Sequence, residues 1–436
     1  MASTNSRYLN EHVETMPREQ IHQLQEHKLG AILDYACERS PLIASVWEKA
    51  GIKPGDISSL EDFAARAPCF DKDDIRAFRD THNDPTGGLA RLSDIDLNKI
   101  ATTSGTTGDP TPFPIRVRAS SDEGYARDFW EMGARPGEYA ILATFTFRIG
   151  IGNHPFINTG AVPILFRHDP HQIPRMADAI RKFKPTLFSL MSTPMLLGFE
   201  KWFKESGVDP RELFAPIKGV LYGGEALSPR LKAMTDRWGL ELFETTSFGD
   251  VMSATECRDH SGFHAFEDMA IAECLDPNGN TPVADGEVGE LVVTTLANPE
   301  VPFIRFRTDD LVVMNRETCP CGRTHARFHI RGRKGDQIKV QGKLILPLDI
   351  RFAIESEPET QGGLFQIIKS ASEMDVLRLR VGHNPDALTT SSSELAGRIE
   401  SIVNNLLDVP VQVELTPDSE LLKLGPPHKI PRVTKA

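Results

Sequence analysis

Short apolar runs alternate with a helical pattern between residues 139 and 225. The β-like runs are YAILATFTF (139–147), AVPILF (161–166), PTLFSLM (185–191) and IKGVLYGGE (217–225). MADAIRKF (176–183) has the apolar spacing of an amphipathic helix. Strands that alternate with helices are typical of parallel βαβ units. This stretch therefore predicts an α/β fold built on a parallel sheet.

The pattern changes twice along the rest of the chain. From about residue 286, GEVGELVVTTL and IRFRTDDLVVM indicate strands joined by turns. After IRGRKGD (330–336), strand-like and helical segments follow one another in a βαββαβ-like order, which suits a small α+β domain. We therefore predict two domains, 1–333 and 334–436, with helices over 20–50 and a loop at TTSSS (389–393).

Composition restricts the function. The 436 residues carry a formal net charge of −12, which argues against a non-specific nucleic-acid binder because phosphate contacts need a basic face. No apolar run approaches the length of a membrane span, and the polar N-terminus lacks the apolar core of a signal peptide. Six cysteines without a secretion signal do not suggest a disulfide framework. A cytoplasmic location without membrane or nucleic-acid partners is expected.

The loop ATTSGTTGDP (101–110) gathers small hydroxyl side chains and glycines. Converging hydroxyls and backbone amides form a cradle for anions, and glycine lets the backbone approach phosphate oxygens. The same residue types also make solvated linkers. The loop lacks the spacing of a Walker A motif, G-x-x-x-x-G-K-[ST]. By itself it leaves a phosphate site and a linker equally open.

Five motifs in order decide between these readings. TTSGTTGDPT resembles the phosphate loop of the adenylate-forming ligases, and YGGEALSP (222–229) resembles their G-G-E turn at the adenine. IRFRTDDL (304–311), GRKGDQIKVQGKLILP (332–347) and HKIPR (428–432) resemble their ribose, hinge and lysine motifs. The N-terminal SPLIASVWEKAGI and DISSLEDFAARAP segments resemble the phenylacetate–coenzyme A ligase branch. The resemblance covers nearly the whole chain.

The resemblance implies a large adenylation domain that binds ATP and a carboxylic acid, and a small mobile lid. It implies that the acid attacks the α-phosphate of ATP, that pyrophosphate leaves, and that a thiol, commonly coenzyme A, then takes the acyl group. The implied phosphate-binding residues are Thr103, Ser104, Gly105, Thr106, Thr107 and Gly108, and the implied adenine-binding residues are Gly223, Gly224 and Glu225.

Three further roles follow from the motifs. Asp310 would accept the ribose hydroxyls with Arg333 beside it, and Lys429 would bridge the carboxylate and the α-phosphate. The resemblance also implies that Thr106, like Lys429, is a catalytic residue. The alternative interpretations are a turn aspartate for Asp310 and a solvated tail lysine for Lys429.

The chain departs from the family pattern at three places. Asp109 stands where the family has the lysine of the phosphate loop. A negative charge there weakens the attraction for a triphosphate unless magnesium or Lys429 compensates. Asp250 is the expected magnesium-binding carboxylate, with Glu244 as second choice. Gly335 occupies the hinge position, where free backbone dihedrals would help a rotating lid, or would simply make a turn.

A cysteine- and histidine-rich pair of segments suggests a structural zinc site. CPCGRTH supplies Cys319 and Cys321, and ECRDHSGFH supplies Cys257 and His264. Thiolates and imidazole suit tetrahedral zinc, and four protein ligands would leave no open position. His325 and His260 are substitute ligands, and a group of reduced buried thiols is the alternative. The remaining cysteines are expected to be ordinary small apolar residues.

The expected acid pocket is aromatic with a few polar groups, which favours a flat aromatic acid. Its candidate residues are Phe147, Arg148, His154, Tyr222, Thr245 and Phe248. Some of these phenylalanines would instead fill the core. Because Arg148, His154 and Thr245 could meet ring substituents, a phenylacetate-like or a hydroxy- or amino-substituted benzoate is the hypothesis.

The sequence thus predicts a magnesium- and ATP-dependent ligase that forms an aryl adenylate and then an acyl thioester, with coenzyme A as the expected second substrate. One alternative passes the acyl group to an amine, a hydroxyl or a carrier-protein thiol. Others are a nucleotide-binding regulatory protein without catalysis and a kinase that releases ADP. The identity of the acid and the oligomeric state are open, with a homodimer as one option.

Overall fold

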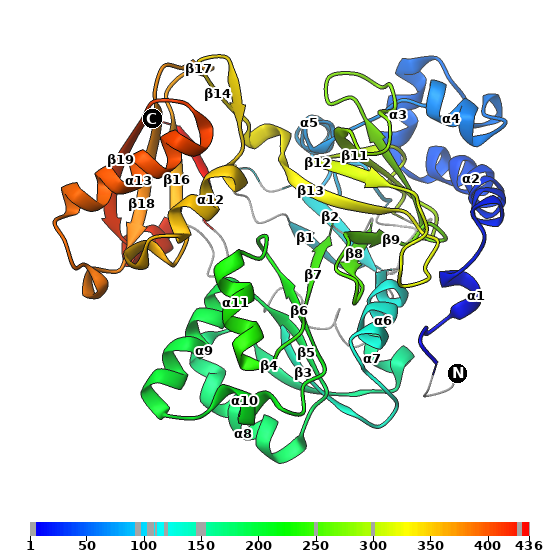
Figure 1. The fold of residues 1–436 in the computed structure, drawn as a ribbon. Coiled ribbons are helices and arrows are strands. Elements are labelled where there is room, and N and C mark those ends of the chain that lie inside the picture. The colour runs from blue at the N-terminus through cyan, green and yellow to red at the C-terminus, as the bar shows by residue number, and fades with distance from the viewer. Residues whose placement is uncertain are drawn as a thin grey trace.

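The computed structural model describes residues 6–91, 97–102, 109, 111–116, 121–144, 154–247, 252–297, 301–424 and 430–435. Its N-terminal helices are α1 (Glu11–Glu14), α2 (Arg18–Arg39), α3 (Pro41–Ala50), α4 (Leu60–Arg66) and α5 (Lys72–His82). They confirm the helices expected over 20–50 (Figure 1). Local chemistry sets their ends: Ser40 caps α3 by accepting the Ile43 amide, and Asp71 and Asp74 form a capping box on α5.

The predicted parallel sheet is confirmed. It consists of β3 (Tyr139–Thr144), β4 (Val162–Arg167), β5 (Leu187–Met191), β6 (Gly219–Gly223) and β7 (Leu242–Ser247), paired in the order β4-β3-β5-β6-β7. The intervening helices are α6 (Ser121–Glu131), α7 (His154–Thr159), α8 (Ile173–Phe183), α9 (Thr193–Ser206), α10 (Pro210–Phe214) and α11 (Pro229–Trp238). Helices α8 to α11 cover one face, and α6 and α7 pack on the other.

The same sheet continues with antiparallel strands, as the run after residue 286 predicts. They are β8 (Ser253–Glu256), β9 (Phe263–Ala265), β10 (Ala270–Leu275), β11 (Val288–Thr295), β12 (Phe306–Asn315) and β13 (Arg327–Arg333). The described sheet has 11 strands in the order β10-β11-β12-β13-β9-β8-β7-β6-β5-β3-β4. Helices α2 and α3 pack on its antiparallel part. Strands β1 (Leu97–Thr102) and β2 (Pro112–Arg116) form a separate antiparallel pair that flanks the glycine- and threonine-rich loop.

The C-terminal part has its own sheets and its own hydrophobic core. Its elements are η4 (Lys334–Asp336), β14 (Ile338–Val340), β15 (Lys343–Ile345), α12 (Pro347–Glu355), β16 (Phe365–Lys369), β17 (Glu373–Met374), β18 (Leu377–His383), α13 (Ser392–Leu407), β19 (Val411–Pro417), α14 (Asp418–Leu421) and β20 (Val433–Lys435). Sheet β19-β18-β16-β20 carries α12 and α13, the expected α+β arrangement. The expected boundary at 333/334 lies where β13 meets η4.

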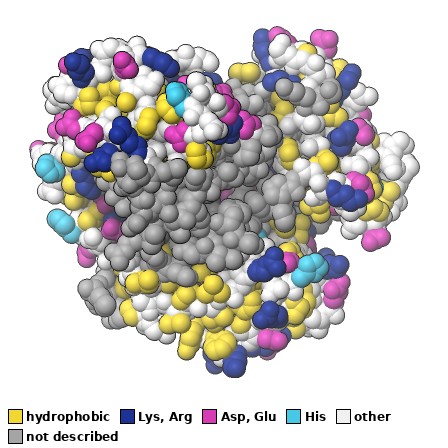
Figure 2. Space-filling model, turned by 180° about the vertical axis from the view of Figure 1, so that it is seen from behind, with side chains coloured by type: hydrophobic (Ala, Val, Ile, Leu, Met, Phe, Trp, Pro, Cys, Tyr) yellow, Lys and Arg dark blue, Asp and Glu magenta, His cyan; other side chains and the backbone are white. Residues whose placement is uncertain are grey.

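Figure 1 shows this C-terminal part beside the upper end of the parallel sheet, above α11. Seen from behind, the described surface mixes lysine and arginine with aspartate and glutamate side chains (Figure 2). No helix in the described ranges is long and apolar enough to cross a membrane. The fold class, α/β with a small C-terminal α+β unit, is as predicted.

Candidate active site

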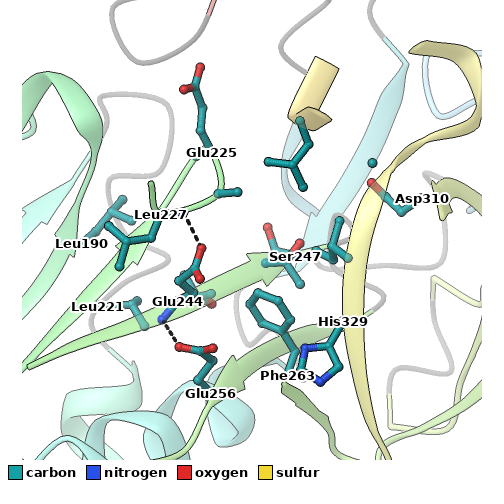
Figure 3. A pocket seen from close by; sticks show the side chains of 18 of the residues that line it. Leu190, Leu221, Glu225, Leu227, Glu244, Ser247, Glu256, Phe263, Asp310 and His329 are labelled. Carbon is teal, nitrogen blue, oxygen red and sulfur yellow. Dashed lines mark hydrogen bonds between the residues drawn. The ribbon is translucent and has the colours of Figure 1, made fainter. Parts of the chain in front are cut away.

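A cavity of about 620 Å³ opens where β6 and β7 end, between these strands, β12 and β13, and the C-terminal part (Figure 3). Ligands of open α/β sheets bind at this carboxyl edge of the parallel strands. The lining residues are Tyr125, Phe129, Leu142, Ala143, Thr144, Pro155, Ser189, Leu190, Leu221, Gly223, Gly224, Glu225, Ala226, Leu227, Glu244, Thr245, Thr246, Ser247, Glu256, Phe263, Asp310, His329, Ile330, Gly332, Arg333, Asp336, Pro347, Leu348, Arg351, Phe352, Phe365 and Arg432.

The turn that follows β6 requires both of its glycines. Gly224 has a φ of +106°, a conformation that side-chain-bearing residues rarely adopt. A Cβ on Gly223 would lie 3.0 Å from Cγ2 of Thr245 on β7. The turn therefore lets the backbone lie against the cavity without side chains that would fill it.

Asp310 and Arg333 face each other on neighbouring strands. They are register partners in the β12–β13 pair, and Arg333 Nε lies 3.4 Å from Asp310 Oδ1. Both line the cavity that the Gly223–Gly224 turn borders. The fold thus brings together the motifs at 222–229, 304–311 and 332–347, although residues 230–303 lie between the first motif and the second.

Glu244 ties β7 to the glycine turn. Its Oε1 accepts the Leu227 amide at 2.7 Å, and its own amide donates to Oε2 of Glu256 at 3.2 Å (Figure 3). Burial raises the pKa of Glu244 to about 7, against the opposing effect of the Leu227 amide, and the negative charge of Glu256 adds to the rise. Because Oε1 of Glu244 accepts the Leu227 amide, the geometry gives Glu244 a positioning role for the glycine turn.

Glu225 does not reach freely into the cavity. Its two carboxylate oxygens accept from Arg432 Nη2 at 2.9 and 2.8 Å, and Arg351 Nη1 lies 3.3 Å from Oε2. Both arginines belong to the C-terminal part and line the cavity. In the sequence, Arg432 is marked only as the last residue of the lysine motif HKIPR, and no motif marks Arg351.

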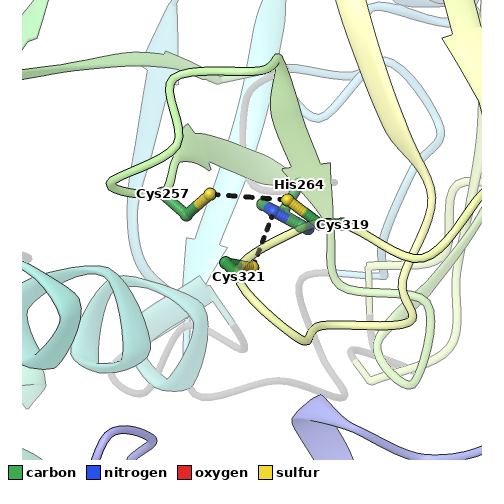
Figure 4. A group of neighbouring side chains, drawn as sticks. All are labelled: Cys257, His264, Cys319 and Cys321. Carbon is green, nitrogen blue, oxygen red and sulfur yellow. Dashed lines mark hydrogen bonds between the residues drawn. The ribbon is translucent and has the colours of Figure 1, made fainter.

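A second cluster lies away from this cavity. Cys257, His264, Cys319 and Cys321 are all buried, and their ligand atoms lie within 4.8 Å of one another (Figure 4). The Sγ atoms of Cys257 and Cys319 are 3.7 Å apart, and Cys321 Sγ is 3.6 Å from His264 Nε2. A tetrahedral zinc site with ordinary bond lengths has S–S and S–N edges of about 3.8 and 3.6 Å, so the cluster is compatible with zinc.

The two substitute ligands are engaged elsewhere. His325 accepts the Glu267 amide on Nδ1 at 2.8 Å, and its Nε2 is 2.9 Å from the Val13 carbonyl oxygen. His260 lies 3.0 Å from Glu256 Oε2. The remaining cysteines at 37, 69 and 274 are free thiols, as expected.

Comparison with known proteins identifies the family. Residues 17–297, more than half of the chain, match the model of the AMP-binding enzymes.

The chain belongs to the AMP-binding enzyme family.

Among curated proteins, the chain is 29% identical over 386 residues to phenylacetate–coenzyme A ligase of Thermus thermophilus, covering 85% of this chain and 83% of that protein. It is 26% identical over 419 residues to the phenylacetate–coenzyme A ligase of Escherichia coli, covering 92% of each. The resemblance drawn from the five motifs is thus confirmed, and with it the expected class, an AMP-forming acid–thiol ligase.

One solved relative occurs in two states. 2-Hydroxyisobutyryl-CoA ligase in the postadenylation state superposes with a TM-score of 0.84 at 25% identity, covering 100% of this chain and 94% of that one. The same enzyme in the thioesterification state, with 2-HIB-AMP and CoA, superposes with a TM-score of 0.70 at 26% identity, covering 100% and 94%. The structure of this AMP-binding enzyme therefore resembles the postadenylation state more closely than the thioesterification state.

Several candidate residues lie outside the described residues: Thr103, Ser104, Gly105, Thr106, Thr107, Gly108, Phe147, Arg148, Phe248, Asp250 and Lys429. His154 begins α7, but its side chain is likewise outside the description. The phosphate loop, the preferred magnesium ligand and the lysine motif thus remain predictions for this AMP-binding enzyme.

Of the pocket residues that the structure describes, Thr245 lines the cavity and Tyr222 does not. Tyr222 is fully buried in the core on the α8–α11 side, where its hydroxyl lies 2.9 Å from Thr193 Oγ1. Tyr222 is therefore a core residue that does not line this cavity. The aromatic residues that do line it include Tyr125 and Phe129 of α6, which a four-residue spacing of aromatic residues could have indicated.

Proposed function

We propose that this enzyme activates a small substituted aromatic acid as its acyl adenylate and transfers the acyl group to coenzyme A. The observation that carries the proposal is a single cavity bordered by the Gly223–Gly224 turn and by the Asp310–Arg333 pair. The family match and the named relatives support adenylate formation. In the first step a carboxylate oxygen bonds to the α-phosphorus while the bond to the leaving pyrophosphate breaks. In the second, a thiol loses its proton, bonds to the acyl carbon and displaces AMP.

The described residues support a site for the nucleoside. Asp310 is only 9% exposed, and Arg333 fixes its carboxylate at the cavity wall, so Asp310 can accept two hydroxyl hydrogens from a ribose. The turn at Gly223 and Gly224 leaves room for a flat base. Lys429 and the loop 103–108 would supply the positive charge and the amides for the phosphates, and Asp250 would hold magnesium.

Other residues that line the cavity support an aromatic acid. Tyr125, Phe129 and Phe263 offer flat apolar surface, while Thr245 and His329 offer hydrogen bonds beside it. Thr245 is held by Thr255, whose Oγ1 lies 2.9 Å from Thr245 Oγ1. A ring with a hydroxyl or amino substituent fits this mixture better than a long alkyl chain.

The Cys257–His264–Cys319–Cys321 cluster would bind one structural zinc ion through three thiolates and His264 Nε2. With four protein ligands, the ion would have no open position for a substrate. Arg323 donates to Cys321 Sγ from its backbone amide at 3.4 Å and from Nη1 at 3.8 Å, and these hydrogen bonds would stabilise the thiolate form of Cys321. Zinc would then connect the loop after β8 with the turn before β13.

The test is pyrophosphate release with ATP, magnesium and a panel of aryl and alkyl acids, with and without coenzyme A, followed by mass spectrometry. We expect release with a substituted aromatic acid and an acyl-CoA mass. An acyl-AMP mass without thioester would replace coenzyme A by another acceptor, and turnover of long-chain acids alone would contradict the aromatic substrate. Lys429→Ala should abolish acyl-AMP formation and spare nucleotide binding. Lys423→Ala is the matched control, because Lys423 pairs with Glu420 at the surface.

A further inference from the structure

Glu225 connects the two parts of the molecule. It lies on the turn after β6, whereas its partners Arg351 and Arg432 lie on α12 and just before β20. The three side chains are 12%, 5% and 11% exposed, so water competes weakly for the ion pairs. A second contact lies nearby, where Arg230 of α11 donates to Gln361 Oε1 at 3.1 Å and to Glu200 at 2.9 Å.

Both arginines also have contacts within the C-terminal part that do not involve Glu225. Arg432 donates to the Gly363 carbonyl oxygen at 2.7 Å, and its guanidinium lies 4.6 Å from the centre of the Phe365 ring. Arg351 donates to Glu355 on its own helix at 2.8 Å, and it also reaches across to the Ala226 carbonyl oxygen on the turn after β6 at 2.5 Å. Both guanidinium groups are thus fixed in orientation, and the carboxylate of Glu225 completes a prepared site.

If the two parts of the molecule separated, Arg351 and Arg432 would both lose Glu225, but they would keep different partners. Arg351 would keep its hydrogen bond to Glu355, whereas Arg432 would keep the carbonyl oxygens of Gly363 and Phe365 and only the longer-range attraction of Glu355. A buried guanidinium that loses its hydrogen-bonded carboxylate is costly unless water replaces that carboxylate. The contact therefore favours the arrangement seen here and opposes any rotation that carries Arg432 away from the turn.

The same contact restrains the lysine motif. Lys429 precedes Arg432 by three residues, and three residues span at most about 10 Å of chain. The Glu225–Arg432 contact therefore limits, through the length of the chain alone, how far Lys429 can lie from the turn after β6. The comparison with the relative points the same way, since the arrangement matches its postadenylation state better than its thioesterification state.

We infer that Glu225, Arg351 and Arg432 form a latch that holds the C-terminal part against the cavity for adenylation and opens before the thiol reacts. Glu225 and Arg432 are thus positioning residues, and the Glu225 carboxylate serves the lid and not the adenine. The inference rests on the proposed function, because it divides that reaction into a latched and an unlatched step.

The first experiment needs no substrate. Distance-reporting labels are placed on non-canonical side chains at the exposed positions Lys204 and Glu414, and distances are measured in the full chain without ligands. We expect one narrow distance distribution for the wild type and a broad or shifted one for E225Q and R432Q. R398Q is the matched control, since Arg398 pairs with Glu357 and Glu359 inside the C-terminal part. An unchanged distribution in E225Q would overturn the latch.

The second experiment separates the half-reactions with the acid that the panel identifies. E225Q should slow acyl-AMP formation by about tenfold or more, as expected for a lost charge-assisted contact, while thioester formation from supplied acyl-AMP changes little. R432K keeps the positive charge but loses the planar guanidinium, so its rate of acyl-AMP formation should lie between the rates of the wild type and E225Q. Equal losses in both half-reactions would contradict the latch. If the wild type activates no acid, the proposed function fails, and the distance measurement still decides whether the latch exists.

Discussion

Arg79 holds Asp109 through two parallel hydrogen bonds, with Nη1–Oδ1 and Nη2–Oδ2 distances both 3.0 Å. Arg79 lies on α5, and Arg76 one turn earlier has its Nε 3.8 Å from Asp109 Oδ2. The hydrogen bonds from Arg79 keep the pKa of Asp109 below its usual value, so the carboxylate is charged and paired. The positive charge that compensates Asp109, expected from magnesium or Lys429, is thus supplied by α5.

Arg79→Gln should weaken ATP binding. It leaves the Asp109 carboxylate without its main partner, next to the loop expected to hold the phosphates. Because Asp109 is exposed, we expect a rise in KM for ATP of only about 2–5-fold, larger at low salt. KM is measured at two ionic strengths. Asp109→Asn in the same chain should restore the wild-type value, and a KM unchanged at low salt would show that the pair has no part in ATP binding.

Much of the fold could be predicted because buried parallel strands are continuous apolar runs. The runs at 185–191 and 217–225 contain the buried strands β5 and β6, whose ends differ from those of the runs by at most two residues. TTSSS was expected to be a loop, yet Ser391 accepts the Glu394 amide as an N-cap and α13 begins at Ser392. The serines belong to a helix start because a hydroxyl can replace the missing backbone partner there.

The site was predicted only where a motif marks it. Asp310 and Arg333 were found because their motifs lie on adjacent strands. Tyr222 was misplaced because side chains alternate along a strand: its neighbours Leu221 and Gly223 line the cavity, and Tyr222 points to the opposite face. The partnership of Glu225 with Arg432 spans 207 residues, and no local pattern encodes such a contact.

Asp310→Ala should remove the preference for a ribose with two hydroxyls. The wild type is expected to use ATP better than 2′-deoxy-ATP by about tenfold, the value of one charge-assisted hydrogen bond. In Asp310→Ala both nucleotides should react equally slowly. The comparison of kcat/KM for the two nucleotides in both proteins isolates the ribose contact from any general loss of stability. A preserved preference in the variant would place the ribose elsewhere.

Loss of one cysteine should release the metal. We expect about one zinc ion per chain by elemental analysis, since four ligands close a single tetrahedral site. Cys321→Ser should lower this content and lower the Tm, because the loop after β8 is then no longer connected to the turn before β13. Cys274→Ser is the control, as Cys274 is buried among apolar residues of the antiparallel strands. Equal zinc content in the wild type and Cys321→Ser would refute the proposed ligand set.

Asp128 should make the wild type less stable as the pH rises. It is 5% exposed, it accepts Thr255 Oγ1–H at 2.8 Å, and burial raises its pKa to about 7 from an ordinary value of 3.8. Between pH 3.8 and about pH 7, the folded state therefore keeps a proton on Asp128 that the unfolded state has released. The stability that the proton brings is complete below pH 4 and is lost as the pH rises through about 7.

Asp128→Asn removes this dependence, because the amide oxygen can still accept from Thr255 and carries no charge. Relative to the wild type, the variant should gain up to about 4 kcal/mol between pH 4 and pH 8, by the value of 1.36 kcal/mol per pKa unit. Urea unfolding at these two pH values measures the gain. Asp178→Asn is the control, since Asp178 is exposed on α8 and its effect should hardly change with pH. A difference between Asp128→Asn and wild type that stays constant from pH 4 to pH 8 would mean that Asp128 is ionised throughout, stabilised by the nearby Arg323 and Arg127 charges that act on it.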